Sequence, residues 1–272
     1  MSIVLAVGVV PGGAAYAGAA APESGIQSSN GTEVTGDWNG DGVDTAGLFD
    51  ARTATWYLRN SNTTGTADIT FVYGNTGETG IPIVGDWDGN GTDTPGLVRG
   101  LTWLLRNANS TGTANISLTY GNNLSARWPV PGDWNGDGTD TPGVFEFSTG
   151  MWHLRNSNTT GLPTIAFRYG DTNEQGRPMV GDWNGNGNDT PGLVRGNNWL
   201  LRNSNSAGTA NISFNYGDGA PPHWPLPGDW NGNGSDTPGV ADPGDPTIWY
   251  LRNSNTTGVG DITFRFGFDP AG

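Results

Sequence analysis

The chain of 272 residues contains 46 Gly, 18 Pro and 12 Trp, and 34% of its residues are apolar. So many residues that resist helix, beside so many aromatic ones, indicate an all-β fold of short strands and turns, and exclude a helical bundle and a disordered chain. The net charge of −14 disfavours nucleic acid and anionic membranes as partners, and the lack of Cys excludes disulfides and Cys-ligated zinc.

The first residues predict a signal peptide over residues 1–17. A short apolar run from Ile3 to Val10 is broken by Pro-Gly-Gly, and Ala15-Tyr16-Ala17 fits a small-residue cleavage site. The run is too short to span a bilayer, so we expect no membrane insertion. The sequence thus predicts a secreted protein with a linker at 18–30.

Residues 31–267 contain five copies of one unit, followed by a tail at 268–272. Gly-Asp-Trp recurs at intervals of 47 or 49 residues, a Trp-x-Leu-Arg-Asn block follows each occurrence, and each copy ends on an aromatic residue and Gly. Alternating apolar residues and turn-forming segments predict four strands per copy. The copies span about 31–74, 81–121, 128–170, 177–217 and 224–267.

Four strands in about 48 residues are the size of one propeller blade. Five copies therefore predict a five-bladed β-propeller with four antiparallel strands per blade, which closes by packing blade one on blade five. The copies also alternate: the second and fourth share Gly-Leu-Val-Arg-Gly, from Gly96 and Gly192, and the third and fifth share Trp-Pro-x-Pro-Gly-Asp-Trp, from Trp128 and Trp224. This alternation indicates that a two-unit block was duplicated.

A loop rich in Asp and Asn follows the first strand of each copy. If the Asp of Gly-Asp-Trp is position 1, positions 3 and 5 carry Asp or Asn, position 6 is Gly and position 8 is Asp. Oxygens at alternate positions of a tight loop can converge on a hard cation such as calcium. The predicted ligands are Asp37, Asn39, Asp41 and Asp44; Asp86, Asp88, Asn90 and Asp93; Asp133, Asn135, Asp137 and Asp140; Asp182, Asn184, Asn186 and Asp189; and Asp229, Asn231, Asn233 and Asp236.

These loops, with the aromatic-Gly endings such as Tyr73-Gly74, resemble FG-GAP or VCBS-type repeats, found in integrin-α-like propellers and related lectins. The resemblance implies an extracellular propeller with up to five calcium ions, devoted to adhesion or ligand binding. The family places Asp at position 9, where this chain has Thr, as at Thr45, and its Asp at position 8. The alternative is a metal-free loop, because Asp and Asn also cap turns.

Other residues allow two interpretations each. The repeated Trp and Arg could bind sugars or carboxylates, but their place in a packing motif favours a structural role, with the Arg between blades and paired with an acidic or carbonyl group. Trp128 and Trp224 could stack on sugar rings or cover neighbouring prolines. The five repeated arginines are Arg59, Arg106, Arg155, Arg202 and Arg252.

Catalytic groups are scarce. The two histidines, His153 and His223, belong to no readable Ser-His-Asp set, and His153 replaces a Tyr or Leu of other copies. A glycosidase would have to draw on acids outside the repeat: Glu33, Asp50, Glu78, Glu146, Asp171 and Glu174.

We therefore expect a non-catalytic recognition module that binds an extracellular glycan through repeated sites. The alternatives are a structural or protein-interaction module and, less favoured, a polysaccharide-cleaving enzyme.

Overall fold

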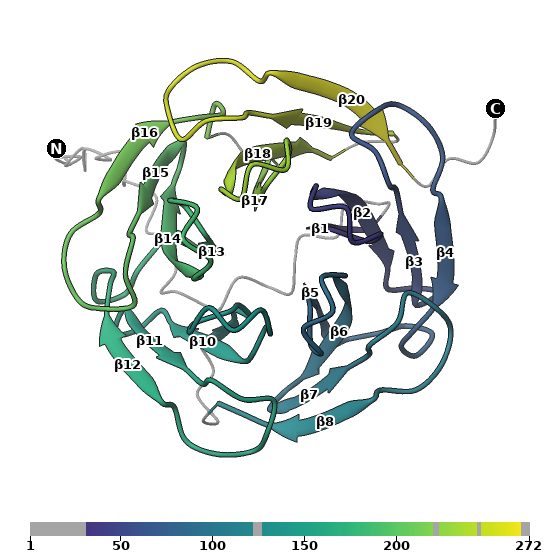
Figure 1. Ribbon diagram of the computed structural model, residues 1–272, viewed down its shortest axis with the longest axis horizontal. Helices are drawn as coiled ribbons and strands as arrows, with labels where there is room; N and C mark the ends of the chain where they lie inside the picture. The colour runs from purple at the N-terminus through teal and green to yellow at the C-terminus, as the bar shows by residue number, and fades with distance from the viewer. Residues whose placement is uncertain (1–30, 122–126, 220–222, 244–245, 268–272) are drawn as a thin grey trace, which may run out of the picture.

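The computed structural model describes residues 31–121, 127–219, 223–243 and 246–267. The predicted signal peptide (1–17), linker (18–30) and tail (268–272) lie outside these ranges. The described residues form five antiparallel sheets of four strands, arranged as blades around a central axis (Figure 1). The predicted all-β, five-bladed propeller is confirmed.

Each blade contains four strands that are consecutive in the sequence. Blade one has β1 (Thr32–Gly36), β2 (Thr45–Asp50), β3 (Thr55–Leu58) and β4 (Ile69–Val72); blade two has β5 (Ile81–Gly85), β6 (Thr94–Arg99), β7 (Thr102–Leu105) and β8 (Ile116–Thr119); blade three has β9 (Arg127–Pro129), β10 (Gly143–Glu146), β11 (Met151–Leu154) and β12 (Ile165–Arg168); blade four has β13 (Arg177–Gly181), β14 (Thr190–Arg195), β15 (Asn198–Leu201) and β16 (Ile212–Asn215); and blade five has β17 (Trp224–Gly228), β18 (Thr237–Asp242), β19 (Thr247–Leu251) and β20 (Ile262–Phe266).

The strands follow one another from the axis to the rim. The first strand of each blade lies innermost and the fourth outermost, as β4, β8, β12, β16 and β20 show at the edge of Figure 1. Within the described ranges, no helix is long and apolar enough to cross a membrane.

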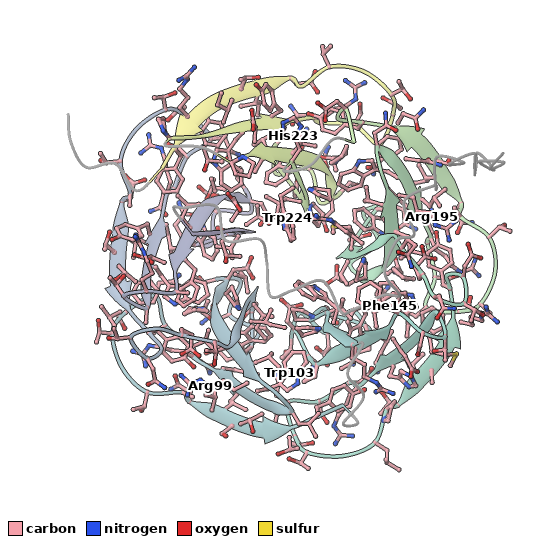
Figure 2. All side chains as sticks on the ribbon, turned by 180° about the vertical axis from the view of Figure 1, so that it is seen from behind. Arg99, Trp103, Phe145, Arg195, His223 and Trp224 are labelled. Atoms are coloured by element: carbon pink, nitrogen blue, oxygen red, sulfur yellow. The ribbon has the colours of Figure 1, made fainter. Side chains whose placement is uncertain are left out.

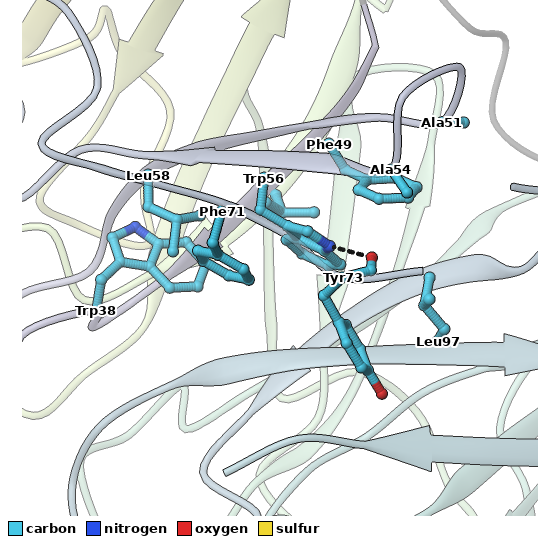
Figure 3. Packing of buried hydrophobic residues seen from close by; sticks show 10 residues of the cluster. Trp38, Phe49, Ala51, Ala54, Trp56, Leu58, Phe71, Tyr73 and Leu97 are labelled. Atoms are coloured by element: carbon cyan, nitrogen blue, oxygen red, sulfur yellow. Dashed lines mark hydrogen bonds between the residues drawn. The ribbon is translucent and has the colours of Figure 1, made fainter. Parts of the chain in front are cut away.

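Apolar faces of neighbouring blades form the core. On β3, Trp56 and Leu58 are fully buried whereas Tyr57 is half-buried, which is the alternation that a strand produces. The Trp56 indole donates a hydrogen bond to the carbonyl oxygen of Tyr73 at 3.0 Å and lies parallel to the Phe71 ring (Figure 3). All five tryptophans at this position have 0% exposure: Trp56, Trp103, Trp152, Trp199 and Trp249.

Blade one also packs on blade five, as the sequence predicted. The hydroxyl of Thr35 on β1 donates to the carbonyl oxygen of Pro227 on β17 at 3.1 Å. Ala46 and Leu48 of blade one share a buried cluster with Trp249 of blade five. The ring is therefore closed without exchange of a strand between the two ends.

Candidate ligand site in the central channel

Within each Asp-rich loop, the side chains at positions 1, 3 and 5 lie together at the surface, at one end of the inner strands. In copy one, both carboxylate oxygens of Asp37 accept loop N–H groups, including those of Gly40 at 2.7 Å and Gly42 at 2.7 Å. The Asn39 amide donates to Asp41 at 3.0 Å. Gly42, at position 6, has a φ of 84°, a left-handed conformation that glycine adopts readily and that lets the backbone turn within the loop.

Position 8 lies elsewhere, and the structure does not bring it into the cage that the sequence suggested. The carboxylate of Asp93 in blade two accepts the N–H of Asp37 in blade one at 2.8 Å. In return, the N–H of Asp93 donates to the carbonyl oxygen of Asp37 at 2.8 Å. The same exchange joins Asp140 to Asp86, Asp189 to Asp133, Asp236 to Asp182 and Asp44 to Asp229. The Asp at position 8 thus links each blade to its neighbour, and we call this pair of hydrogen bonds the joint between blades.

These five carboxylates form a ring, here called the Asp ring: Asp44, Asp93, Asp140, Asp189 and Asp236. All five line the central cavity and are half-buried. Loss of hydration, together with the negative charge of neighbouring aspartates, raises the pKa of each, to about 7 for Asp93 and Asp236. The Asp93 and Asp236 carboxyls therefore take up protons near neutral pH, and the other three do so at a higher pH than an ordinary aspartate.

This geometry limits how the loops could hold calcium. Within the described residues, no group of three or more His, Asp or Glu side chains is placed to hold a metal ion. The side chains at positions 1, 3 and 5 do gather, and in copies one to three they include two carboxylates each. A calcium ion would thus have to use positions 1, 3 and 5 with backbone oxygens, and bound there it would neutralise the loop carboxylates.

The inner strands enclose a cavity of about 310 Å³ along the axis. The Asp ring lies against the glycines that end these strands, such as Gly36. The first residues of the strands lie at the opposite end of the channel, about 13 Å away at the usual rise of an extended strand. We call that end the mouth.

Five equivalent positions surround the mouth, each four residues before the Gly of Gly-Asp-Trp. They carry Thr32, Ile81, Trp128, Arg177 and Trp224 in blades one to five. Trp128 and Trp224 line the cavity and are only half-buried, unlike the repeated tryptophans. Trp224 lies beside the central opening in Figure 2.

Arg177 packs flat against Trp224. Its guanidinium carbon lies 3.4 Å from the centre of the indole ring, a cation–π contact between blades four and five. The Nη1 atom of Arg177 is buried without a hydrogen-bond partner. Arg177 also forms no ion pair with an acid among the residues that the structure describes. Burial lowers the pKa of Arg177 to about 10. The mouth thus contains a cation that nothing in the described chain neutralises.

Glu33 is a buried acid in the wall of the same cavity. It is 7% exposed, and its Oε1 has no hydrogen-bond partner. Burial raises its pKa to about 7, with a partial offset from its own backbone N–H. Glu33 follows the mouth position of blade one and shares a strand face with Thr35, which bonds to β17. Glu33 therefore faces the blade that carries Trp224.

The other acids outside the repeat are held in ion pairs. Glu78 pairs with Arg99 at 2.5 Å, and Glu174 with Arg195 at 2.6 Å. Asp171 also lies 2.8 Å from Arg195, Asp50 pairs with Arg52 at 3.1 Å, and Glu146 lies 3.6 Å from Arg127 and 3.5 Å from His153. His223 lies between Asp218 and Asp242, at 2.7 and 3.3 Å.

The repeated arginines have a structural role, as the sequence favoured, although each acts within its own blade rather than between blades. The Arg59 guanidinium donates to the carbonyl oxygens of Thr63 and Thr66 at 2.6 Å each, which holds the β3–β4 loop around it. Arg106, Arg155, Arg202 and Arg252 repeat this arrangement. Since the paired tryptophans are fully buried, this Trp–Arg unit offers no sugar platform.

Sequence reasoning named Trp128, Trp224 and Glu33 but did not bring them together, and it missed Arg177. A signal was present. Glu33 replaces a Pro found in the other four copies, and Arg177 stands where the other copies have uncharged residues. Such departures from a repeat mark the residues that the scaffold itself does not require.

No family model matches the chain, so membership of the FG-GAP or VCBS family is not confirmed. A search of curated protein sequences finds no significant match. Similar solved structures include a lectin of Agrocybe aegerita described as recognising non-reducing terminal N-acetylglucosamine, at 15% identity and a TM-score of 0.46, which covers 84% of this chain and 64% of the lectin.

Another similar structure is the Tc holotoxin pore of Photorhabdus luminescens, at 14% identity and a TM-score of 0.45, which covers 83% of this chain and 11% of the toxin chain. A third is a chain of the BBS1N–ARL6DN complex, at 11% identity and a TM-score of 0.36, with 86% and 69% covered. The chain thus spans less than two thirds of the first two proteins. At these identities and TM-scores, the likenesses carry no functional argument.

Proposed function

We propose that this protein is a non-catalytic recognition module that binds a carbohydrate at the mouth of its central channel. The observation that carries the proposal is the placement of Trp128 and Trp224, two half-buried indoles that line one cavity from blades three and five. Flat apolar rings bordered by polar groups are suited to stacking on sugar rings. One asymmetric site thereby replaces the repeated sites that the sequence suggested.

The state of the acids supports recognition without catalysis. Glycoside hydrolysis requires two carboxyl groups on opposite sides of the scissile bond. Of the six acids that the sequence analysis singled out, five are held in ion pairs, and Glu33 lines the cavity without one. The aspartates that share the cavity belong to its opposite end, where they join the blades.

Secretion and calcium binding belong to the same proposal and rest on the sequence. The apolar segment and cleavage site at residues 1–17 support export, and the Asp-rich loops support calcium at positions 1, 3 and 5. Calcium there would stiffen loops at the far end of the channel and would not touch the sugar.

Binding of soluble plant and bacterial wall oligosaccharides, measured by calorimetry, tests the site. We expect Trp128→Ala and Trp224→Ala each to weaken binding by about 10-fold, the usual contribution of a stacked aromatic ring. Tyr250→Ala removes an aromatic ring from the surface of β19, away from the channel, and should leave binding unchanged. Equal affinity in all three variants, or no binding of any oligosaccharide, contradicts the proposal and favours a protein-interaction module.

A further inference from the structure

The mouth contains three side chains from neighbouring blades whose capacity for contacts the fold does not fully satisfy. Trp128, Arg177 and Trp224 occupy the same position on consecutive blades. Arg177 covers one face of Trp224 yet has a buried nitrogen without a partner. A guanidinium taken out of water without a counter-charge is costly, so a ligand anion would satisfy it.

The rest of the chain restricts what that anion can be. The protein has a net charge of −14, and the Asp ring lies in the same cavity, so a polyphosphate or nucleic acid would be repelled. One uncompensated arginine suits one negative charge, and its planar fork matches a carboxylate. The flanking indoles suit a ring that carries this carboxylate.

Glu33 supplies the complementary polar contact. Its Oε1 is buried and unpartnered in the cavity wall, on the opposite side of Trp224 from Arg177 in blade order. A sugar hydroxyl can donate to a carboxylate or accept from a carboxylic acid, so it can satisfy Glu33 in either state.

We propose that the ligand of the mouth is an acidic sugar, a uronic acid residue whose carboxylate pairs with Arg177 while its ring stacks on Trp128 and Trp224 and a hydroxyl bonds to Glu33. This inference rests on the proposed carbohydrate site and names its ligand class. Arg177 selects the acid, and Glu33 and the indoles bind the sugar irrespective of its charge.

The test compares galacturonate, a single sugar with one carboxylate, with its methyl ester, which removes the charge and keeps the ring. For the unmodified protein, calorimetry should give binding to the acid form about 10- to 100-fold tighter than to the ester. Arg177→Gln should remove this preference without weakening binding to the ester. Glu33→Ala should weaken binding to both forms by a similar factor.

Matched variants separate recognition from folding. Arg265→Gln removes the same charge from the exposed outer strand β20 and should change neither affinity. Arg177→Lys keeps the charge but loses the planar fork, and we expect it to retain part of the preference. Melting temperatures of all variants establish that each is folded.

The outcomes distinguish the two proposals. Equal binding of acid and ester, or a preference that survives in Arg177→Gln, overturns the acidic-sugar inference and leaves the carbohydrate site intact. If neither form nor any neutral oligosaccharide binds, both proposals fail together.

Discussion

Asp44 of the first blade and Asp229 of the last exchange two hydrogen bonds. The Asp229 N–H donates to the Asp44 carboxylate at 2.7 Å, and the Asp44 N–H donates to the Asp229 carbonyl oxygen at 2.9 Å. The other four joints between blades use the same pair of bonds. The ring is thus closed by the contact that also builds it, which places five carboxylates around one axis.

Proton uptake by the Asp ring should make the propeller more stable in mild acid than in base. The pKa of each ring carboxyl is raised in the folded state, so the folded protein binds more protons than the unfolded chain between the ordinary value of 3.8 and about 7. Stability therefore rises as the pH falls from 8 to 5, by roughly 1–3 kcal/mol after allowance for partial exposure.

Urea unfolding at fixed salt between pH 5 and 8 measures this slope. Glu33 acts in the same direction because burial also raises its pKa to about 7. His153 opposes it with at most one proton, since burial lowers its pKa. A midpoint that rises with pH over this window contradicts the assignment.

Substitutions at the closing joint separate the hydrogen bond from the charge. Asp44→Ala leaves the Asp229 N–H without its acceptor, and we expect a loss of about 1–3 kcal/mol in the free energy of unfolding. Asp44→Asn keeps an acceptor oxygen and removes a charge from the ring, so at pH 8 it should cost less than the alanine and flatten the pH slope. Asp88→Ala, which removes an exposed acid of the blade-two loop, is the control when all measurements are made in calcium-free buffer. If all three variants change the free energy of unfolding equally at pH 8, Asp44 does not join the two blades in the way described.

The architecture could be read from the sequence because every blade repeats the same packing. Trp56 and its four equivalents recur at one spacing, and each is fully buried. A periodic pattern of this kind specifies both the strands and their number. The alternation of copies, which indicated only a duplication, also has a physical counterpart: Arg99 and Arg195 of Gly-Leu-Val-Arg-Gly pair with Glu78 and Glu174.

The candidate ligand site at the mouth could not be predicted from the repeat pattern. Trp128, Arg177 and Glu33 come from three blades, far apart in the sequence, and only closure of the ring brings the starts of their inner strands to one opening. The role of position 8 was missed for a related reason. Asp44 lies seven residues from Asp37 and fits a local cage, but its partner is Asp229 of another blade. A contact between distant segments produces no regular residue spacing from which the sequence could predict it.

The ion pair between Glu78 and Arg99 should be a major local contribution to stability. Burial alone would raise the pKa of Glu78, but hydrogen bonds from Arg99, Asn75 and Gly80 outweigh it and lower the pKa to about 2. Its contribution is therefore complete above pH 4.5 and is lost as the pH falls towards 2.

We expect Glu78→Gln to cost about 2–4 kcal/mol at pH 7, because the substitution leaves the Arg99 charge without a partner. The double variant Glu78→Gln with Arg99→Met should cost less than the sum of the single changes, as a double-mutant cycle by urea unfolding can measure. Additive losses would mean that the two side chains act independently.

Calcium binding stays a prediction of the sequence, and the structure makes it specific to positions 1, 3 and 5. Copies one to three have two carboxylates at these positions, so we expect about three calcium ions per chain after dialysis against calcium, and a lower melting temperature in EDTA. Asp137→Asn removes one of the two carboxylates in copy three and should lower the count by one.

Asp140→Asn is the matched control in the same loop. The Asp140 carboxylate accepts the Asp86 N–H at 2.8 Å and is not directed at its own loop, so this substitution should leave the calcium count unchanged. Elemental analysis of the dialysed proteins gives the counts. A loss of calcium in Asp140→Asn but not in Asp137→Asn would mean that the carboxylate at position 8 is a calcium ligand after all. The absence of stoichiometric calcium in the unmodified protein would mean that hydrogen bonds alone hold these loops, as those of Asp37 to Gly40 and Gly42 already do in copy one.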